Sequence, residues 1–413
     1  MEKMKWLYPG LKFKRWVVVI FLGALLLSIG ISFAIGLETL TIIDSDLTGI
    51  SLIILGIILV SLGIKRMLAS IYEVLLPNKD EELVDLLYQK RYRKRGPKIV
   101  VVGGGTGLST MLRGIKKFTD NITAIVTVAD DGGSSGALRN ELGILPPGDI
   151  RNCLVALADT EPLMEKLFQY RFTEGDDLKG HSFGNLFIAT MSEVLGDFEE
   201  AVKESSKVLA IKGQVLPSTL EDLRLSARLD NGELIKGESQ IPKVRGKIEE
   251  VFIHPKDSKP LPEALEAIKD ADAIILGPGS LYTSVLPNLL VRDLTKSIKV
   301  SPAAKIYICN VMTQLGETDD YKASDHIEAI YDHVGPGIVD YIISNNELID
   351  NELLEKYAQE GAKPVKVDCD RLKELGVKII EGGVVDQSDL VRHDPEKLAQ
   401  VIIELILNIK EED

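Results

Sequence analysis

Cysteine and histidine are scarce in this chain. Its 413 residues include three cysteines, Cys153, Cys309 and Cys369, and five histidines. No two cysteines form a Cys-x-x-Cys pair, and no cysteine and histidine stand at the spacing of zinc ligands, so the pattern excludes a disulfide framework and a structural zinc site. We expect the cysteines to be reduced thiols in the core of a cytosolic domain.

Basic residues are in the minority. Lys and Arg number 48 against 62 Asp and Glu, and the formal net charge is −14. Proteins bind DNA or RNA by neutralising phosphates with clustered Lys and Arg, so nucleic acid is not an expected partner. The hydrophobic share of 45% is that of a folded protein, and the chain is long enough to bury a large core in one or two domains.

Charged residues are absent from two stretches near the N-terminus, 16–37 and 47–64. Each is close to the ~20 apolar residues that a helix needs to cross ~30 Å of hydrocarbon. Basic residues precede the first stretch and follow the second, and acidic residues lie between them, so the positive-inside rule places both ends in the cytoplasm. We therefore expect residues 1–66 to form a transmembrane hairpin.

The predicted hairpin carries no ionisable residue within its spans, so no path for an ion or a proton is visible, and we expect an anchor rather than a transporter. Gly23 and Gly30 in the first span, and Gly56 and Gly63 in the second, would let the helices approach closely. The expected location is the cell membrane, as a multi-pass protein with its main domain in the cytoplasm.

Residues 67–96 connect the hairpin to the rest of the chain. Apolar residues at helical spacing predict a juxtamembrane helix that Pro77 interrupts. The basic run 90–95 has two interpretations, contact with anionic lipid headgroups or a solvated linker. Gly96-Pro97 then marks a boundary, and we predict that residues 97–413 form one cytoplasmic domain.

Short apolar runs alternate with helical patterns beyond this boundary, which predicts an α/β fold with a doubly wound, mainly parallel sheet. Short strands separated by Gly, Pro and Asp-Asn-Gly predict a small β-rich insertion at about 207–255, with Asp230-Asn231-Gly232 as a hairpin turn. Helices are expected at 108–118, 263–269 and 327–333. The expected strands of the main sheet are 99–102, 123–128, 273–276, 305–309 and 341–344.

A glycine-rich run, Gly103-Gly104-Gly105-Thr106-Gly107, lies where the first strand of the main sheet passes into a helix. Residues without Cβ allow positive φ and let backbone N–H groups approach a phosphate, which the helix dipole also attracts. Leu108 replaces the third glycine of the dinucleotide fingerprint, and no Lys-Ser/Thr pair follows, which excludes a P-loop. The run predicts a nucleotide site; the alternative is a turn that only packs helix on strand.

Asp130 and Asp131 follow the second predicted strand. An acid at this strand end reaches a ribose hydroxyl in many doubly wound folds, and Asp130 is the better placed of the two. Adjacent carboxylates repel unless one meets a cation or strong donors, so Asp131 either holds a metal ion or caps the next turn. Both are candidates for acid–base chemistry, and the alternative is that Asp-Asp-Gly-Gly simply forms a turn.

Three more polar stretches lie at the same predicted edge. Arg151 suits a phosphate because its guanidinium makes paired hydrogen bonds, and His181 has a helix cap or core contact as its alternative role. The stretch 277–284 has the same order as the first loop: an apolar strand, then glycines, then residues with hydroxyl groups. Two such loops suit a ligand with two phosphates. The candidate contacts here are Asp149, Arg151, Asn152, His181, Asn185, Gly277, Gly279, Ser280, Tyr282 and Thr283.

Together, the motifs GGGTGLS, VADDGGSSG, LPPGDIRN, GHSFGN, GPGSLYTS, CNVMTQ and VRHD resemble the gluconeogenesis-factor family, relatives of the deazaflavin 2-phospholactate transferases. The resemblance covers residues 98–397. It implies a Rossmann-like core and a protein that binds UDP-N-acetylglucosamine and is needed for cell shape and wall synthesis on gluconeogenic carbon sources. Many family members lack a hairpin, so a cytosolic location does not carry over.

The resemblance implies that the two glycine loops, the acidic pair Asp130 and Asp131, and Asn185 contact the ligand. It adds Tyr357 in KYAQEGAKPV as a flat face for a base or sugar, and Arg392 in VRHD as a diphosphate clamp. Exposed Tyr and Arg are common on helices, so position alone singles out neither.

The segment GGSSGALRNELGILPPGDIRN separates the two branches and resembles the gluconeogenesis factors. No reaction is established for that branch, so we expect a binding protein with no cofactor beyond its ligand. The alternative is a transferase that moves a phospholactyl group from a guanosine diphosphate carrier to a deazaflavin, with Mg²⁺ on Asp130 or Asp131. A nicotinamide oxidoreductase is a third interpretation, which Leu108 weakens. Expected partners are the membrane, cell-wall synthesis or regulatory proteins, and a second copy in a homo-oligomer.

Overall fold

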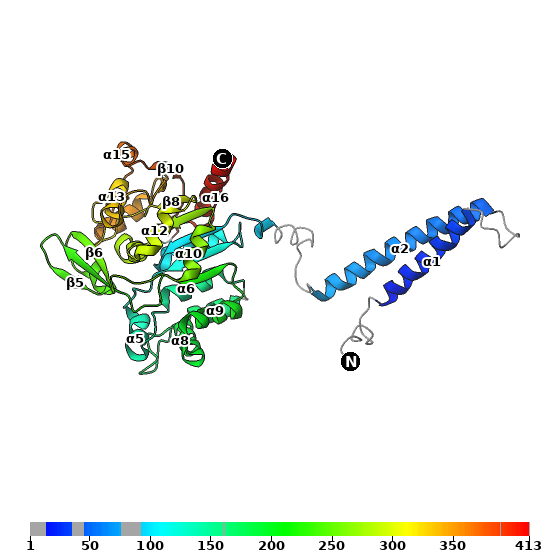
Figure 1. The fold of residues 1–413 in the computed structure, drawn as a ribbon, viewed down its shortest axis with the longest axis horizontal. Coiled ribbons are helices and arrows are strands. Elements are labelled where there is room, and N and C mark those ends of the chain that lie inside the picture. Colours follow the sequence, from blue (N-terminus) through cyan, green and yellow to red (C-terminus); the bar gives the residue numbers. More distant parts are fainter. Residues whose placement is uncertain (1–13, 35–44, 76–91, 160–161, 389, 413) are drawn as a thin grey trace. The chain divides into compact units, whose positions relative to one another are not determined.

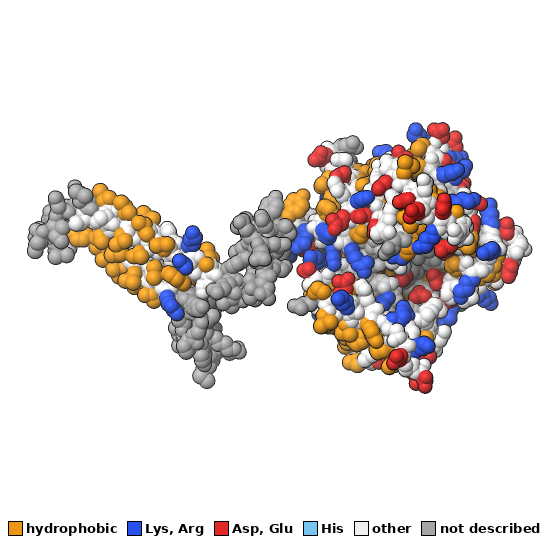
Figure 2. Space-filling model, turned by 180° about the vertical axis from the view of Figure 1, so that it is seen from behind, with side chains coloured by type: hydrophobic (Ala, Val, Ile, Leu, Met, Phe, Trp, Pro, Cys, Tyr) orange, Lys and Arg blue, Asp and Glu red, His pale blue; other side chains and the backbone are white. Residues whose placement is uncertain are grey.

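The computed structural model describes residues 14–34, 45–75, 92–159, 162–388 and 390–412. The chain divides into two compact units, residues 1–90 and 91–413. Figure 2 shows how their surfaces differ: hydrophobic side chains cover the helices of the first unit, whereas basic and acidic side chains are interspersed over the second.

The N-terminal unit contains two helices, α1 (Lys14–Ala34) and α2 (Ser45–Leu75) (Figure 1). Within them, residues 15–33 and 48–70 are long and apolar enough to cross a membrane. α2 continues past residue 66 without a break, so the start of the predicted juxtamembrane helix is part of the second apolar helix. Its remainder at 76–91, including Pro77, lies outside the described residues.

Glycines hold α1 and α2 close together. A Cβ atom built on Gly23 would lie 2.8 Å from Val60 Cγ2, and one built on Gly56 would lie 2.8 Å from the Gly23 carbonyl oxygen. At Gly30 and Gly63 the nearest side chains of the opposite helix would be 2.8 and 2.5 Å away. These distances are too short for a carbon atom, so the predicted close approach at all four glycines is confirmed.

The larger unit is built around a seven-stranded sheet in the order β10-β9-β8-β7-β1-β2-β3, and every neighbouring pair is parallel. β1, β2 and β7 are buried along their whole length, which is why they read as unbroken apolar runs. The strands are β1 (Ile99–Gly103), β2 (Ile122–Val126), β3 (Gln214–Pro217), β7 (Ala273–Leu276), β8 (Ala304–Ile308), β9 (Tyr341–Asn345) and β10 (Lys378–Gly382).

Helices cover the sheet and connect its strands (Figure 1). α4 follows β1 and packs against both α6 and the C-terminal α16. The helices are α4 (Gly105–Ile115), α5 (Gly133–Leu142), α6 (Gly148–Leu157), α7 (Pro162–Gln169), α8 (Phe183–Leu195), α9 (Phe198–Val208), α10 (Pro262–Lys269), η3 (Leu281–Val285), α11 (Leu286–Leu289), α12 (Arg292–Val300), α13 (Ala323–Val334), α14 (Asn351–Gln359), α15 (Cys369–Glu374) and α16 (Pro395–Glu412).

The predicted doubly wound, mainly parallel sheet is confirmed. All five predicted strands are present, with ends shifted by at most two residues, and α4, α10 and α13 correspond to the three predicted helices, although α4 ends at Ile115 and residues 116–118 form a turn. The sequence pattern missed the two edge strands, β3 and β10. β10 is only half-buried and β3 is four residues long and ends in proline, so neither gives the apolar signal of a central strand.

A separate antiparallel sheet in the order β5-β4-β6 stands at one edge of the larger unit (Figure 1). The predicted hairpin turn at 230–232 is confirmed: Gly232 has φ +83° and donates to the Leu229 carbonyl oxygen. The insertion is narrower than 207–255 because β3 belongs to the main sheet. Its elements are β4 (Arg224–Leu229), β5 (Leu234–Lys236), η2 (Glu238–Lys243) and β6 (Ile248–His254).

The last residues of the predicted linker pack on the larger unit. Arg93 Nε lies 3.6 Å from Asp120 Oδ1, and the Asn121 side chain donates to the carbonyl oxygens of Lys94 and Gly96. These contacts explain why the compact unit begins ahead of residue 97.

Two of the three cysteines belong to the core. Cys153 on α6 and Cys309 after β8 are buried, and burial raises the pKa of the Cys309 thiol to about 12. Cys369, at the start of α15, is exposed. The expectation that all three are core residues is therefore wrong for Cys369.

Candidate functional site

The strand order reverses between β1 and β7. β2 and β3 extend the sheet on one side of this pair, and β8, β9 and β10 extend it on the other. In open parallel sheets, ligands bind in the crevice outside the carboxyl ends of the strands where the order reverses. The two predicted glycine loops, 103–107 and 277–284, follow these two strands.

The first loop uses its glycines in two ways. Gly105 has φ +69°, and a Cβ built there would meet only the Ser284 hydroxyl, at 3.4 Å. A Cβ on Gly104 would lie 2.6 Å from Asp149 Oδ2, and one on Gly107 would lie 2.8 Å from the Pro278 carbonyl oxygen. Close packing therefore accounts for Gly104 and Gly107, whereas Gly105 provides the left-handed turn into α4.

The second loop packs directly on the first. Gly277 has φ +83°, and a Cβ on Gly279 would lie 3.1 Å from the Gly104 carbonyl oxygen. A side chain at Gly279 would push the two loops apart. The loops thus form one backbone surface, although they are more than 170 residues apart in the sequence.

A pocket of about 380 Å³ lies against this surface, which is within the size range of small-molecule sites. We call it the switch-point pocket. It brings together predicted residues from four separate stretches of the chain: Gly105, Thr106, Gly107, Gly279, Ser280, Tyr357 and Arg392. The lining residues that the sequence did not single out are Thr110, Pro278, Ser284, Asn310, Val311, Met312, Thr313, Gln314, Val391 and His393.

Among the described residues, which leave out Asp389, no carboxylate lines the switch-point pocket. Arg392 is exposed, and its guanidinium forms no ion pair with any residue in the described part of the chain. His393 is neutral because burial lowers its pKa to about 4. The N-terminus of α4 adds partial positive charge, so the pocket suits an anion such as a diphosphate.

Tyr357 on α14 fixes the strand that carries Arg392. Its hydroxyl accepts a hydrogen bond from the Val391 backbone N–H at 3.1 Å, and its ring packs against a small cluster that includes Val311 and Met312. Tyr357 therefore lines the switch-point pocket. It also positions Arg392, because it holds the backbone of the preceding residue, Val391.

The chain is similar to several known proteins. The family model of 2-phospho-L-lactate transferase CofD matches residues 99–385. A putative gluconeogenesis factor from Nostoc sp. is 50% identical over 417 residues, which cover 97% of this chain and 91% of the relative. The gluconeogenesis factor of Bacillus subtilis is 52% identical over 311 residues, which cover 75% of this chain and 98% of the relative.

The chain belongs to the gluconeogenesis-factor family. The resemblance seen in the motifs is thereby confirmed. The crystal structure of protein BH3568 from Bacillus halodurans is 55% identical, covers 76% of this chain and 99% of that chain, and has a TM-score of 0.73. This likeness confirms the Rossmann-like fold of the larger unit.

The Bacillus relatives have the length of the larger unit alone. Nearly all of BH3568 is matched by 76% of this chain, and the CofD match also lies within 91–413. BH3568 crystallised as a folded protein of that extent, and we therefore expect residues 91–413, the gluconeogenesis-factor domain, to fold without the apolar helices. The Nostoc relative, by contrast, aligns with 97% of the chain.

In this gluconeogenesis-factor domain the acidic pair after β2 is not part of the switch-point pocket. Asp130 Oδ1 accepts a hydrogen bond from the Gly132 N–H at 2.9 Å, as in an Asx turn. Asp131 Oδ1 accepts one from the Ser239 N–H at 2.9 Å, at the start of η2. Asp131 therefore caps a turn, as one of the two predictions had it. The capped turn belongs to the β-rich insertion and is not the turn that follows Asp131 in the sequence.

Acidic side chains crowd together beside the first loop. Burial and the charge of Asp130 raise the pKa of Asp149 to about 6, although the Gly105 N–H favours its charged form. Burial and the charges of Asp130 and Asp149 raise the pKa of Glu238 to about 8. Burial raises the pKa of Glu317 to about 7. In the described residues, no three Asp, Glu, His or Cys side chains are arranged to hold a metal ion.

We expect Glu238→Gln to stabilise the domain at alkaline pH. The Glu238 carboxyl binds its proton more tightly in the folded state, so its contribution to the free energy of unfolding is full below pH 4.5 and is lost as pH rises through about 8. At pH 9, the variant should have a free energy of unfolding on the order of 2 kcal/mol higher than the wild type, and the gap should close near pH 5. Urea denaturation of residues 91–413 measures this, with Glu233→Gln on the exposed hairpin as control. An equal gap at both pH values would contradict it.

A polar cluster lies between α5 and α8. The Ser134 hydroxyl is 3.1 Å from His181 Nδ1 and accepts a hydrogen bond from Asn185 Nδ2 at 3.2 Å. Residues 132–136 also match the Gly-x-Ser-x-Gly spacing of a nucleophile elbow, but Ser134 is buried and begins α5 well after β2 has ended. Arg151 Nη2 donates to its neighbour Asn152 at 2.6 Å. These predicted contacts form a second group, apart from the pocket lining.

Tyr282 and Thr283 contact protein groups. The Tyr282 hydroxyl is 2.7 Å from the Tyr321 hydroxyl, and the Thr283 hydroxyl donates to Glu317 at 3.1 Å. Both residues are buried, and neither lines the switch-point pocket. Two hydroxyls of the same segment, those of Ser280 and Ser284, line it instead.

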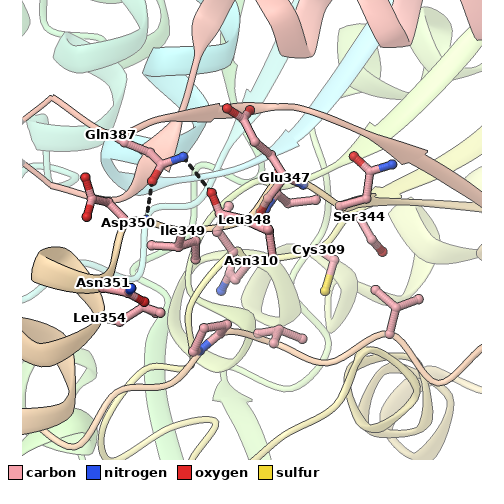
Figure 3. Close-up of a pocket in the computed structure, with 16 residues that line it drawn as sticks. Cys309, Asn310, Ser344, Glu347, Leu348, Ile349, Asp350, Asn351, Leu354 and Gln387 are labelled. Atoms are coloured by element: carbon pink, nitrogen blue, oxygen red, sulfur yellow. Dashed lines mark hydrogen bonds between the residues drawn. The ribbon is translucent and has the colours of Figure 1, made fainter.

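A larger pocket of about 840 Å³ adjoins the first one (Figure 3). We call it the β9 pocket, because residues 344–351 at the end of β9 form much of its wall. Asn310 and Val311, which follow β8, line both pockets. Sequence reasoning missed this site, although the signal was present: polar residues follow the predicted strands at 310, 314 and 345–347, at the same sheet edge as the glycine loops.

Proposed function

We propose that this protein binds UDP-N-acetylglucosamine and regulates cell shape and cell-wall synthesis during gluconeogenic growth. Its membership of the gluconeogenesis-factor family is shown by its relatives; the ligand and the cellular role are what the motif resemblance implies. Regulation would pass through protein partners that sense the liganded state.

The observation that carries the proposal is the composition of the switch-point pocket. Two glycine-rich loops, the N-terminus of α4 and Arg392 meet there, and none of the described residues that line the pocket carries a carboxylate. Hydroxyls of Thr106 and Ser280 add neutral donors. This combination suits a diphosphate, which is the part that all nucleotide-diphosphate sugars share.

We also propose that α1 and α2 anchor the domain at the cytoplasmic face of the cell membrane. Their length and apolar composition support this location, and the basic residues Lys65 and Arg66 follow the second uncharged stretch, as the positive-inside rule requires. Association of domains into a homo-oligomer is part of the same proposal.

Calorimetric titration of residues 91–413 with UDP-N-acetylglucosamine tests the ligand. We expect saturable binding at one site and a raised Tm, since ligand at 100 times its Kd stabilises the folded state by about 2.7 kcal/mol. ADP-glucose serves as the comparison ligand. Absence of both heat and a Tm shift with UDP-N-acetylglucosamine would contradict the proposal.

A transferase is the second candidate, and the acidic cluster beside the first loop favours it. The charge of Asp130 helps to raise the pKa of Asp149, the charges of both help to raise the pKa of Glu238, and a cation would relieve that repulsion. Mg²⁺ commonly takes one or two carboxylates and completes its shell with substrate phosphates and water, so it would need only two of these carboxylates and not a preformed three-carboxylate site, which the described residues lack. Bound there, Mg²⁺ would neutralise the leaving phosphate; the chain's own N–H groups and Arg392 would hold the diphosphate.

Release of GMP from a phospholactyl guanosine diphosphate in the presence of a deazaflavin tests this second candidate. The transferase predicts GMP release that requires Mg²⁺ and is lost in Asp130→Asn. Ligand binding without turnover, with and without Mg²⁺, would rule it out.

A further inference from the structure

The β9 pocket differs in charge from the switch-point pocket that it adjoins. Among the residues that the structure describes, its lining contains two carboxylates, Glu347 and Asp350, and no Lys or Arg. Glu347 is paired with Lys397 at 3.2 Å, and Asp350 Oδ1 accepts from the Glu352 N–H at 3.2 Å. A phosphate would be repelled from this pocket, whereas hydroxyls could donate to its oxygen atoms.

The shape of the lining suits a flat heterocycle. Leu354, Pro364, Val365 and Val367 supply apolar surface, and the Asn346 side chain supplies both a donor and an acceptor. A uracil ring has two apolar faces and an edge that alternates acceptor, donor and acceptor. A pyranose ring has hydroxyls around its whole rim and would use this apolar surface less well.

The loop at 345–351 in the wall of the β9 pocket is held in place by side-chain hydrogen bonds, one set from the loop and one from Gln387 (Figure 3). Gln387 donates to the Leu348 carbonyl oxygen at 3.0 Å and accepts from the Asp350 N–H at 2.7 Å. Asn345 bonds both the N–H and the carbonyl oxygen of Glu347. The wall is therefore organised before a ligand arrives, which lowers the entropy cost of binding.

One polar group of the lining is left unsatisfied. Ser344, the fourth residue of β9, is 2% exposed, and its hydroxyl has no hydrogen-bond partner in the described part of the chain. A buried hydroxyl without a partner costs free energy, and ligand atoms or ordered water in the pocket would satisfy it.

We infer that the β9 pocket binds the nucleoside of the ligand, with its base on the apolar wall and its ribose hydroxyls toward Asp350, while the diphosphate lies in the switch-point pocket. Asn310 and Val311 line both pockets, so the two pockets are neighbours and the two parts of one ligand would lie side by side. This inference rests on the proposed function and goes beyond it, because it names the residues that select the base.

Leu354→Trp tests the placement, with Glu355→Trp as its matched control. Leu354 is half-buried on α14 and lines the β9 pocket, whereas Glu355 is the next residue of the helix and is exposed. Filling the pocket with an indole should weaken UDP binding to residues 91–413 about tenfold or more and leave inorganic pyrophosphate binding unchanged. Glu355→Trp should change neither.

Asn346→Ala gives a second readout that does not depend on pocket volume. We expect it to bring the Kd values for UDP and CDP closer together, because the side chain reads the edge of the base. Unchanged UDP affinity in Leu354→Trp, or an unchanged UDP to CDP ratio in Asn346→Ala, would overturn the inference and leave the proposed function standing. Failure of the wild-type domain to bind both UDP and pyrophosphate would instead overturn the proposed function itself.

Discussion

Gly105→Val is expected to abolish binding of UDP-N-acetylglucosamine while the domain stays folded. Gly105 lines the switch-point pocket in the left-handed conformation at φ +69°, and a valine there would place its methyl groups where the phosphate approaches the α4 N-terminus. The backbone strain should lower the free energy of unfolding by about 1 to 3 kcal/mol, which a domain of this size tolerates. Calorimetry measures the binding and circular dichroism the fold.

Gly376→Val separates strain from obstruction. Gly376 has a similar φ of +78°, with no atom within 4 Å of a built Cβ, and it follows α15 rather than lining the pocket. This variant should show a comparable loss of stability and bind the ligand normally. If Gly105→Val bound as well as Gly376→Val, the phosphate would not lie at the first loop.

Arg392→Ala is expected to weaken binding by roughly 1.5 to 3 kcal/mol, or about 10- to 150-fold in Kd, the range for a hydrogen bond to a charged group. The effect should be large because Arg392 is the one basic side chain that lines the switch-point pocket in the described part of the chain. Titration of the domain with UDP measures it.

The control for Arg392 is Arg228→Ala on β4. Arg228 is also exposed, but it pairs with Glu250 at 3.2 Å in the insertion and lies outside both pockets. The Arg228→Ala variant should have the same affinity for UDP as the wild type. Equal affinities for Arg392→Ala and Arg228→Ala would show that the guanidinium faces away from the ligand.

The sheet could be predicted from the sequence because its central strands are buried on both faces. The run at 99–102 is entirely apolar and ends in glycine, and such a pattern defines a parallel strand and its turn. The edge strand β10 carries Lys378 and Glu381 toward solvent and lacks that pattern. Edge strands take their register from the neighbour they pair with, which no local pattern records.

The site could be predicted in part. Loops after β1 and β7 were recognisable because strand, glycine and hydroxyl residues are adjacent in the sequence, but their packing on each other was not. The need for glycine at positions 104 and 107 comes from Asp149 and Pro278, which are remote in the chain. Tyr357 and Arg392 were identified through family resemblance alone, since nothing local marks them.

The β9 pocket was missed because its polar residues look like an ordinary loop. Asn345 and Glu347 are typical turn residues, and the loop that follows them is held at Leu348 and Asp350 by Gln387, which approaches from another part of the chain. The same limit applies to Asp131, for which the sequence left a metal ion and a turn cap open; the structure shows its contact with η2.

A crystal structure of residues 91–413 soaked with UDP-N-acetylglucosamine tests the central claim most directly. The account predicts both phosphorus atoms beside Gly105 and Gly279, within reach of the Arg392 guanidinium, and the uracil ring in the β9 pocket. A diphosphate bound beside Asp130 and Ser134, with the surface between the two glycine loops empty, would contradict it.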